Sequence, residues 1–132
     1  MSFLRHFWPA LAWALLILIL CIIPGQELPQ WGWTDLINLD KITHAGVFGL
    51  LALFIYRGLL LQYGSSVKRS SCVALALIIS TLYGVATEVI QGTLVEGRVA
   101  DPLDQVANMV GIGATWIVIA KGIGGQYIHP SD

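Results

Sequence analysis

Short polar stretches divide the chain into four long apolar runs. The runs cover about residues 7–23, 41–61, 72–91 and 103–123. Each is close to the ~20 residues that an α-helix needs to cross the ~30 Å apolar core of a bilayer. Charged residues rarely interrupt them, as expected for helices in apolar surroundings on every side. The sequence therefore predicts an all-α bundle of four transmembrane helices, which forms a single domain over residues 1–132.

The first apolar run follows Arg5 and in this respect is similar to a signal peptide. A cleavable signal needs small residues before the cut, and residues 18–21, Leu-Ile-Leu-Cys, provide none. We therefore expect this run to remain in the protein as the first span.

Residues 26–40, which connect the first two runs, are polar and aromatic. They contain Trp31 and Trp33, together with acidic residues, and they lack lysine and arginine. Tryptophan is enriched where a membrane meets water. The pattern predicts a tryptophan belt on a short helix that lies along the membrane surface.

The composition agrees with a membrane location. Hydrophobic residues make up 56% of the 132 residues and charged residues 11%, whereas a soluble domain carries about 25% charged residues. The net charge is -1 and no basic run occurs. A nucleic-acid partner is therefore not expected, and the partners that remain are membrane lipids.

The distribution of basic residues predicts the orientation. Four spans bring both termini to the same side of the membrane. Two basic residues, Lys41 and Arg98, fall on the opposite side. Those on the side of the termini are Arg5, Arg57, Lys68, Arg69 and Lys121. The positive-inside rule then predicts cytoplasmic termini in a multi-pass protein, with the polar stretches around Asp40 and Arg98 outside the cell.

Polar residues gather at the predicted outer ends of three helices. Helical spacing of three or four residues places them on shared faces at one depth. Such convergence predicts a ligand-binding pocket. Its members are Asp40, Lys41, His44, Glu88, Gln91, Arg98, Asp101, Asp104 and Asn108.

Two kinds of chemistry fit these residues. Lys41, His44 and Arg98, beside the positive ends of two helix dipoles, are suited to an anion such as a phosphate headgroup. Alternatively, His44 and the carboxylates of Glu88, Asp101 and Asp104 suit a divalent cation or acid–base catalysis, with Glu88 and His44 as the candidate catalytic residues. No strong metal motif such as HExxH is present, so the sequence assigns no metal site.

Simpler structural roles are also open for several of these residues. Asp101 before Pro102 has the pattern of a helix N-cap, and Asp104 would then stabilise the first turn. Asp40 is a candidate cap for the second helix. Ala107, Gly111 and Thr115 recur every four residues and predict close helix packing.

Three short motifs at these helix ends have a spacing that is specific in combination. They are Asp40-Lys41-Ile42-Thr43-His44, then Tyr83-Gly84 followed by Glu88 and Gln91, and Gly97-Arg98 followed by Asp101, Asp104, Asn108 and Gly111. In this combination the chain resembles the VanZ-like family of small bacterial membrane proteins. It departs from the family at Ala45, where an aromatic residue is frequent, and at Thr115, where a second glycine is common.

The resemblance implies a multi-pass protein of the bacterial cytoplasmic (inner) membrane. The family is named for an accessory role in resistance to the glycopeptide antibiotic teicoplanin, and no reaction is implied. We expect the outer pocket to bind an anionic lipid or a lipid-linked cell-wall precursor, with Lys41, His44 and Arg98 on the headgroup. The alternatives are an enzyme acting on such a lipid, or a structural or assembly protein without a ligand.

Overall fold

The computed structural model describes residues 2–24 and 33–123, and it is helical throughout these ranges apart from the connections. The helices are α1 (Ser2–Cys21), α2 (Trp33–Tyr63), α3 (Arg69–Leu94) and α4 (Pro102–Val118), and a π-helical segment, η2 (Ile119–Ile123), continues α4. All four α-helices are long and apolar enough to cross a membrane. The predicted all-α fold with four candidate transmembrane helices is confirmed.

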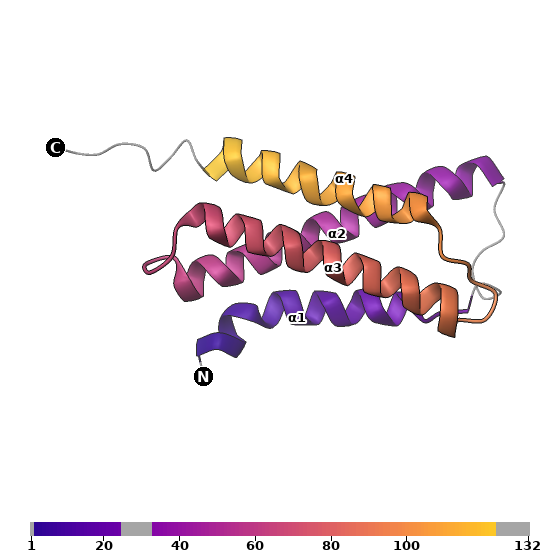
Figure 1. Cartoon of the computed structure of the whole chain (residues 1–132), viewed down its shortest axis with the longest axis horizontal. Coiled ribbons are helices and arrows are strands. Elements are labelled where there is room, and N and C mark those ends of the chain that lie inside the picture. The colour runs from indigo at the N-terminus through magenta and orange to yellow at the C-terminus, as the bar shows by residue number, and fades with distance from the viewer. Residues whose placement is uncertain (1, 25–32, 124–132) are drawn as a thin grey trace.

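Consecutive helices run antiparallel, as Figure 1 shows. The start of α1 and the far end of α4 lie at the left of that view, together with the connection between α2 and α3. We call this end the basic end, because Arg5, Arg57, Lys68, Arg69 and Lys121 lie there. The opposite end, with the end of α1, the start of α2 and the connection between α3 and α4, is the acidic end. Which end faces the cytoplasm stays a prediction.

Helix α2 begins at Trp33 rather than near Lys41. A separate short helix along the membrane surface is therefore wrong for residues 33–40, which continue directly into the second span. Asp40 lies inside the helix and does not cap it. The remainder of the predicted tryptophan belt, including Trp31, lies outside the described residues. Helix α3 likewise continues past Gln91 to Leu94.

Helix α2 is at the centre of the bundle. It contacts α1, α3 and α4, whereas α1 and α4 do not touch each other within the described ranges. The α2–α4 crossing is close because Gly111 packs against backbone: a Cβ there would collide with the carbonyl oxygen of Ala45. One turn further, the Thr115 hydroxyl donates to the carbonyl oxygen of Gly49 at 2.8 Å. These contacts confirm the packing role predicted for the small-residue stripe.

Helix α1 joins the bundle through apolar contacts and two polar ones. Trp13 Nε1 donates to the Val47 carbonyl oxygen of α2 at 2.9 Å. The Tyr83 hydroxyl of α3 donates to the Ala14 carbonyl oxygen at 2.7 Å. Because Trp and Tyr each present an apolar body with one polar atom, both can be buried only if that atom finds a partner. The contacts hold α1 beside the α2–α3 pair, where it forms one wall of the pocket described below.

Candidate functional site

The start of α4 places two aspartates at the acidic end. Asp101 is the N-cap, and its Oδ1 accepts a hydrogen bond from the Leu103 amide at 2.9 Å. Pro102 occupies the first turn, where its missing amide hydrogen costs nothing. Asp104 follows in the same turn, at the positive end of the helix dipole. The predicted capping roles are confirmed, and both side chains also reach toward α2.

Lys41 of α2 binds both of these aspartates. Its Nζ donates to Asp101 Oδ2 at 2.7 Å and to Asp104 Oδ1. It also lies 3.7 Å from Asp40 Oδ2. The hydrogen bond from Lys41 and that from the Leu103 amide hold the pKa of Asp101 below its usual value. Lys41 is only 22% exposed, so its charge is committed to joining α2 to α4.

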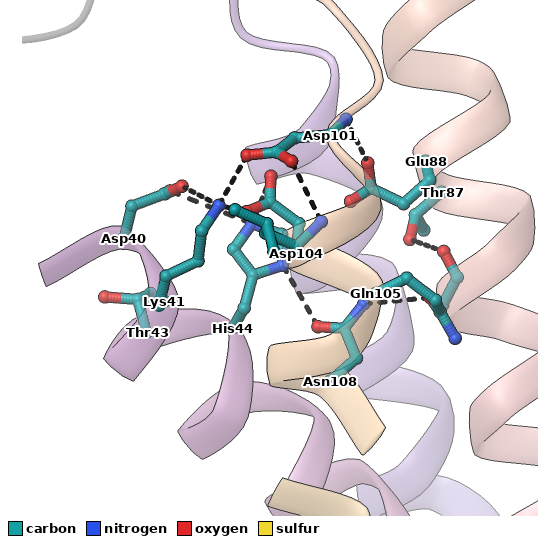
Figure 2. Close-up of polar contacts among 12 residues, drawn as sticks. Asp40, Lys41, Thr43, His44, Thr87, Glu88, Asp101, Asp104, Gln105 and Asn108 are labelled. Carbon is teal, nitrogen blue, oxygen red and sulfur yellow. Dashed lines mark hydrogen bonds and ion pairs between the residues drawn. The ribbon is translucent and has the colours of Figure 1, made fainter. Parts of the chain in front are cut away.

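His44 lies one turn further along α2 and faces α4 (Figure 2). Its Nδ1 is 3.0 Å from Asn108 Oδ1. Its Nε2 points to two carboxylates, 3.8 Å from Asp40 Oδ1 and 3.7 Å from Asp104 Oδ2. Asn108 is fully buried, and its Nδ2 donates to Gln105 Oε1 at 3.3 Å.

Glu88 brings α3 to the same cluster. Its Oε2 accepts a hydrogen bond from the Asp101 backbone amide at 3.3 Å. Its Oε1 is buried and has no hydrogen-bond partner among the described residues. The residue is 8% exposed, and Figure 2 shows its carboxylate directed from α3 toward Asp101 and Asp104. A buried carboxylate oxygen without a donor is costly, so this group needs an explanation.

Arg98 lies apart from the aspartates that hold Lys41. Gly97, with a φ of 73°, makes the turn after α3 that only glycine adopts easily. Arg98 then lines a pocket of about 220 Å³ between α1, α2 and α3. Its Nε is buried without a hydrogen-bond partner, and no ion pair to it occurs among the side chains described, those of residues 3–24 and 39–121.

The pocket beside Arg98 combines an apolar wall with a polar rim. The apolar wall comes mainly from α1, with Val47 and Phe48 of α2. The polar rim comprises Asp40, Thr43, His44, Gln91 and Arg98. Gln91 is buried at this rim. The pocket is therefore shaped for a molecule with one apolar and one polar part.

The structure brings all nine predicted site residues to the acidic end, in two groups. Seven form the network around Lys41, His44 and Glu88, whereas Gln91 and Arg98 line only the pocket rim. Sequence reasoning missed Gln105, although it precedes Asn108 by one helical turn. It also missed the α1 wall formed by Ile17, Leu20 and Cys21, because apolar residues in a span carry no distinguishing signal.

The predicted use of two helix dipoles is not supported. Helix α2 starts at Trp33, about two turns before Lys41, so its free amides are far from the site. The N-terminus of α4 is already occupied by the Asp101 carboxylate. At this end, Arg98 is therefore the residue left to bind an anion, and backbone amides are not.

Comparison with known proteins identifies no relative. The chain matches no protein-family model, no curated protein and no solved structure. The resemblance to the VanZ-like family therefore stays a prediction that rests on the motifs themselves.

Proposed function

We propose that the chain is a VanZ-like protein of the bacterial cytoplasmic membrane whose pocket binds an anionic lipid. The Arg98 guanidinium binds a phosphate of the headgroup, and the apolar wall receives the first part of the lipid tail. An arginine suits this task because its planar group forms paired hydrogen bonds to phosphate oxygens. The lipid is a phospholipid or a lipid-linked cell-wall precursor, since both carry a phosphate next to an apolar chain.

The observation that carries the proposal is the contrast between two cations at the acidic end. Lys41 is bound by Asp101 and Asp104 and has no free charge to offer. Arg98 lines the pocket and has no ion-pair partner among the described residues. A partly buried arginine is costly unless an anion compensates its charge. A lipid phosphate provides this compensation.

The shape of the pocket favours a lipid over a soluble anion. Ile17, Leu20 and Ile23 of the α1 side contribute apolar surface that a free phosphate would leave uncovered. A lipid covers this surface while its phosphate reaches Arg98. Lipid binding of this kind uses the same two contributions as other small-molecule sites, namely apolar burial and a few directed polar contacts.

The test is native mass spectrometry of the protein extracted in mild detergent with its own lipids. We expect the wild type to retain a lipid whose mass identifies a phospholipid or a lipid-linked precursor. Arg98→Gln should lower retention by roughly 10–100-fold, the range for a lost charge-assisted hydrogen bond. Arg57→Gln is the matched control, because Arg57 is an exposed arginine near the basic end of α2. Equal retention by Arg98→Gln and the control would refute the proposal.

An acid–base reaction on the bound lipid is a second candidate function. The residues that line the pocket indicate which of the two candidate catalytic residues could carry it out. His44 lines the pocket and Glu88 does not. His44 is therefore the residue that can reach a pocket-bound lipid, whereas Glu88 lies toward the aspartates. If the retained lipid is chemically altered by the wild type and unaltered by His44→Gln, the protein is an enzyme.

A further inference from the structure

We infer that Asp40, His44 and Asp104 bind a divalent metal cation, to which Glu88 supplies a further carboxylate oxygen. The inference does not depend on lipid binding, because every proposed ligand belongs to the chain itself. It changes the ligand set that the sequence left open for a divalent cation: Asp40 takes the place of Asp101, which binds Lys41.

The distances between the three side chains are suited to a shared ion. One ligand atom from each residue lies within 4.8 Å of the others. His44 Nε2 is 3.8 Å from Asp40 Oδ1 and 3.7 Å from Asp104 Oδ2. Ligands bound at about 2.1 Å from a zinc ion lie roughly 3–4 Å from each other. Small side-chain adjustments therefore suffice to close the site.

Lys41 and the proposed cation use different oxygen atoms of the same aspartates. Lys41 Nζ binds Asp104 Oδ1 and lies near Asp40 Oδ2. The oxygens nearest to His44 are Asp104 Oδ2 and Asp40 Oδ1. The ammonium group therefore holds both carboxylates in place from one side and leaves their other oxygens directed at His44. This is how supporting hydrogen bonds orient the ligands of known metal sites.

The hydrogen bonds of His44 leave its Nε2 available as a ligand. Because Asn108 Nδ2 donates to Gln105, Asn108 Oδ1 is the atom that faces His44. A carbonyl oxygen accepts, so Nδ1 of His44 carries the hydrogen. In a neutral ring Nε2 then has a lone pair, which faces two carboxylate oxygens. That arrangement is repulsive unless a proton or a metal cation lies between them.

Glu88 provides an independent indication of a ligand at this position. It is 8% exposed, and its Oε1 is buried without a hydrogen-bond partner among the described residues. Figure 2 shows this carboxylate on the α3 side of the cluster, turned toward Asp104. Glu88 lies outside the group of three whose ligand atoms are within 4.8 Å of one another, so its carboxylate would join the proposed ion after a side-chain adjustment and would then find a partner for this oxygen.

The charge of the cluster also favours a bound cation. Asp40, Asp101 and Asp104 surround the ammonium group of Lys41, and Glu88 lies beside them, accepting a hydrogen bond from the Asp101 backbone amide. Excess negative charge in a partly buried cluster is costly and is relieved by protons or by a bound cation. One imidazole with several carboxylates is a ligand set for Zn²⁺ or Mn²⁺, because imidazole favours zinc and carboxylates favour manganese.

The test is isothermal titration of Zn²⁺ and of Mn²⁺ into the full chain in detergent, after chelator treatment and removal of bound lipid. We expect one cation to bind per chain. Mutating a residue that only hydrogen-bonds to a metal ligand typically weakens metal binding by roughly 10–100-fold. His44→Gln and Asp40→Asn remove ligands themselves, so each should weaken binding by at least this much. His6→Gln is the control, because His6 lies at the basic end and contacts Gln62.

Asp40→Asn keeps the test valid if other variants unfold. The Asp40 side chain is 45% exposed, so we expect the Asp40→Asn variant to fold normally. A wild type that binds neither ion more tightly than Asp40→Asn would overturn the inference. Because the probe is the metal alone, this failure would leave lipid retention by Arg98 unaffected, and a failure of lipid retention would leave the metal titration unaffected.

Discussion

The two ends of the bundle carry charge in different ways. The basic end holds five lysines and arginines, and no acidic residue occurs there among the residues described. Arg57 and Lys68 are exposed, and Arg69 donates to the Tyr56 hydroxyl at 2.6 Å. The acidic end contains Asp104 and Glu88, which are largely buried. Charges at one end therefore face the surroundings, and those at the other mostly face each other.

This difference indicates separate roles for the two ends. Long, exposed basic side chains such as those of Arg57 and Lys68 can reach the headgroups and water. The unequal number of lysines and arginines at the two ends influences the orientation of the protein in the membrane. Short, buried carboxylates cannot reach water, so each needs a donor or a cation nearby. A site is expected at the end where partners are obligatory, and that is where Lys41, His44 and Asn108 lie.

The predicted membrane orientation gives the largest expected difference between the two ends, because a cysteine on one side of the membrane either reacts with an impermeant reagent or does not. In a background without Cys21 and Cys72, a cysteine at Glu96 should react in intact cells with a reagent that cannot cross membranes. A cysteine at Ser65, between α2 and α3, should react only after permeabilisation. The opposite pattern would place the acidic end in the cytoplasm and exclude a pocket that faces outward.

Replacing Lys41 with methionine should have the next largest effect. The change removes the ammonium group that bridges Asp101 and Asp104. Loss of one partner of a buried ion pair costs roughly 3–5 kcal/mol, and we expect the lower part of that range because Asp101 is 43% exposed. Thermal and denaturant unfolding in detergent measure the change. Lys68→Met, at the basic end, should alter stability by less than about 0.5 kcal/mol, and equal losses would contradict the contrast between the ends.

Replacing Gly111 with alanine should have a smaller effect on stability. The new methyl group would press on the Ala45 carbonyl and separate α2 from α4. Overpacking of this kind costs about 1–3 kcal/mol. Gly113→Ala is the control, since no atom lies within 4 Å of its Cβ position; that change should be neutral or stabilising by up to ~1 kcal/mol. If both variants unfold alike, the close crossing does not hold the acidic end together.

Much of the fold was predictable from local patterns. The four apolar runs indicated the helices, and the Asp101-Pro102 pair indicated where α4 begins. The start of α2 was missed, because polar and aromatic residues are typical both of a surface helix and of a helix that extends into the headgroup region. The absence of glycine and proline from residues 33–40 was the signal that favoured one continuous helix.

The candidate site was predictable as a set of residues and not as a set of contacts. Helical spacing placed Lys41, His44 and Asp104 at one depth. It did not show that Lys41 would form ion pairs with two aspartates or that Arg98 would lie beside an apolar wall. Those facts depend on the direction in which each helix face points, which spacing within one helix leaves open.

The sequence by itself determined four helices, each long and apolar enough to cross a membrane, and grouped Asp40, Glu88, Asp101 and Asp104 at one end of them. It could do so because membrane spanning depends on a property of each segment, the length of its apolar run. Only the tertiary structure decided the pairing of charges. Lys41 and Asp101 are 60 residues apart, and they meet because Gly111 lets α2 and α4 approach closely. The close packing of α2 and α4 places Lys41 in contact with the two aspartates, whereas Arg98 lines the pocket.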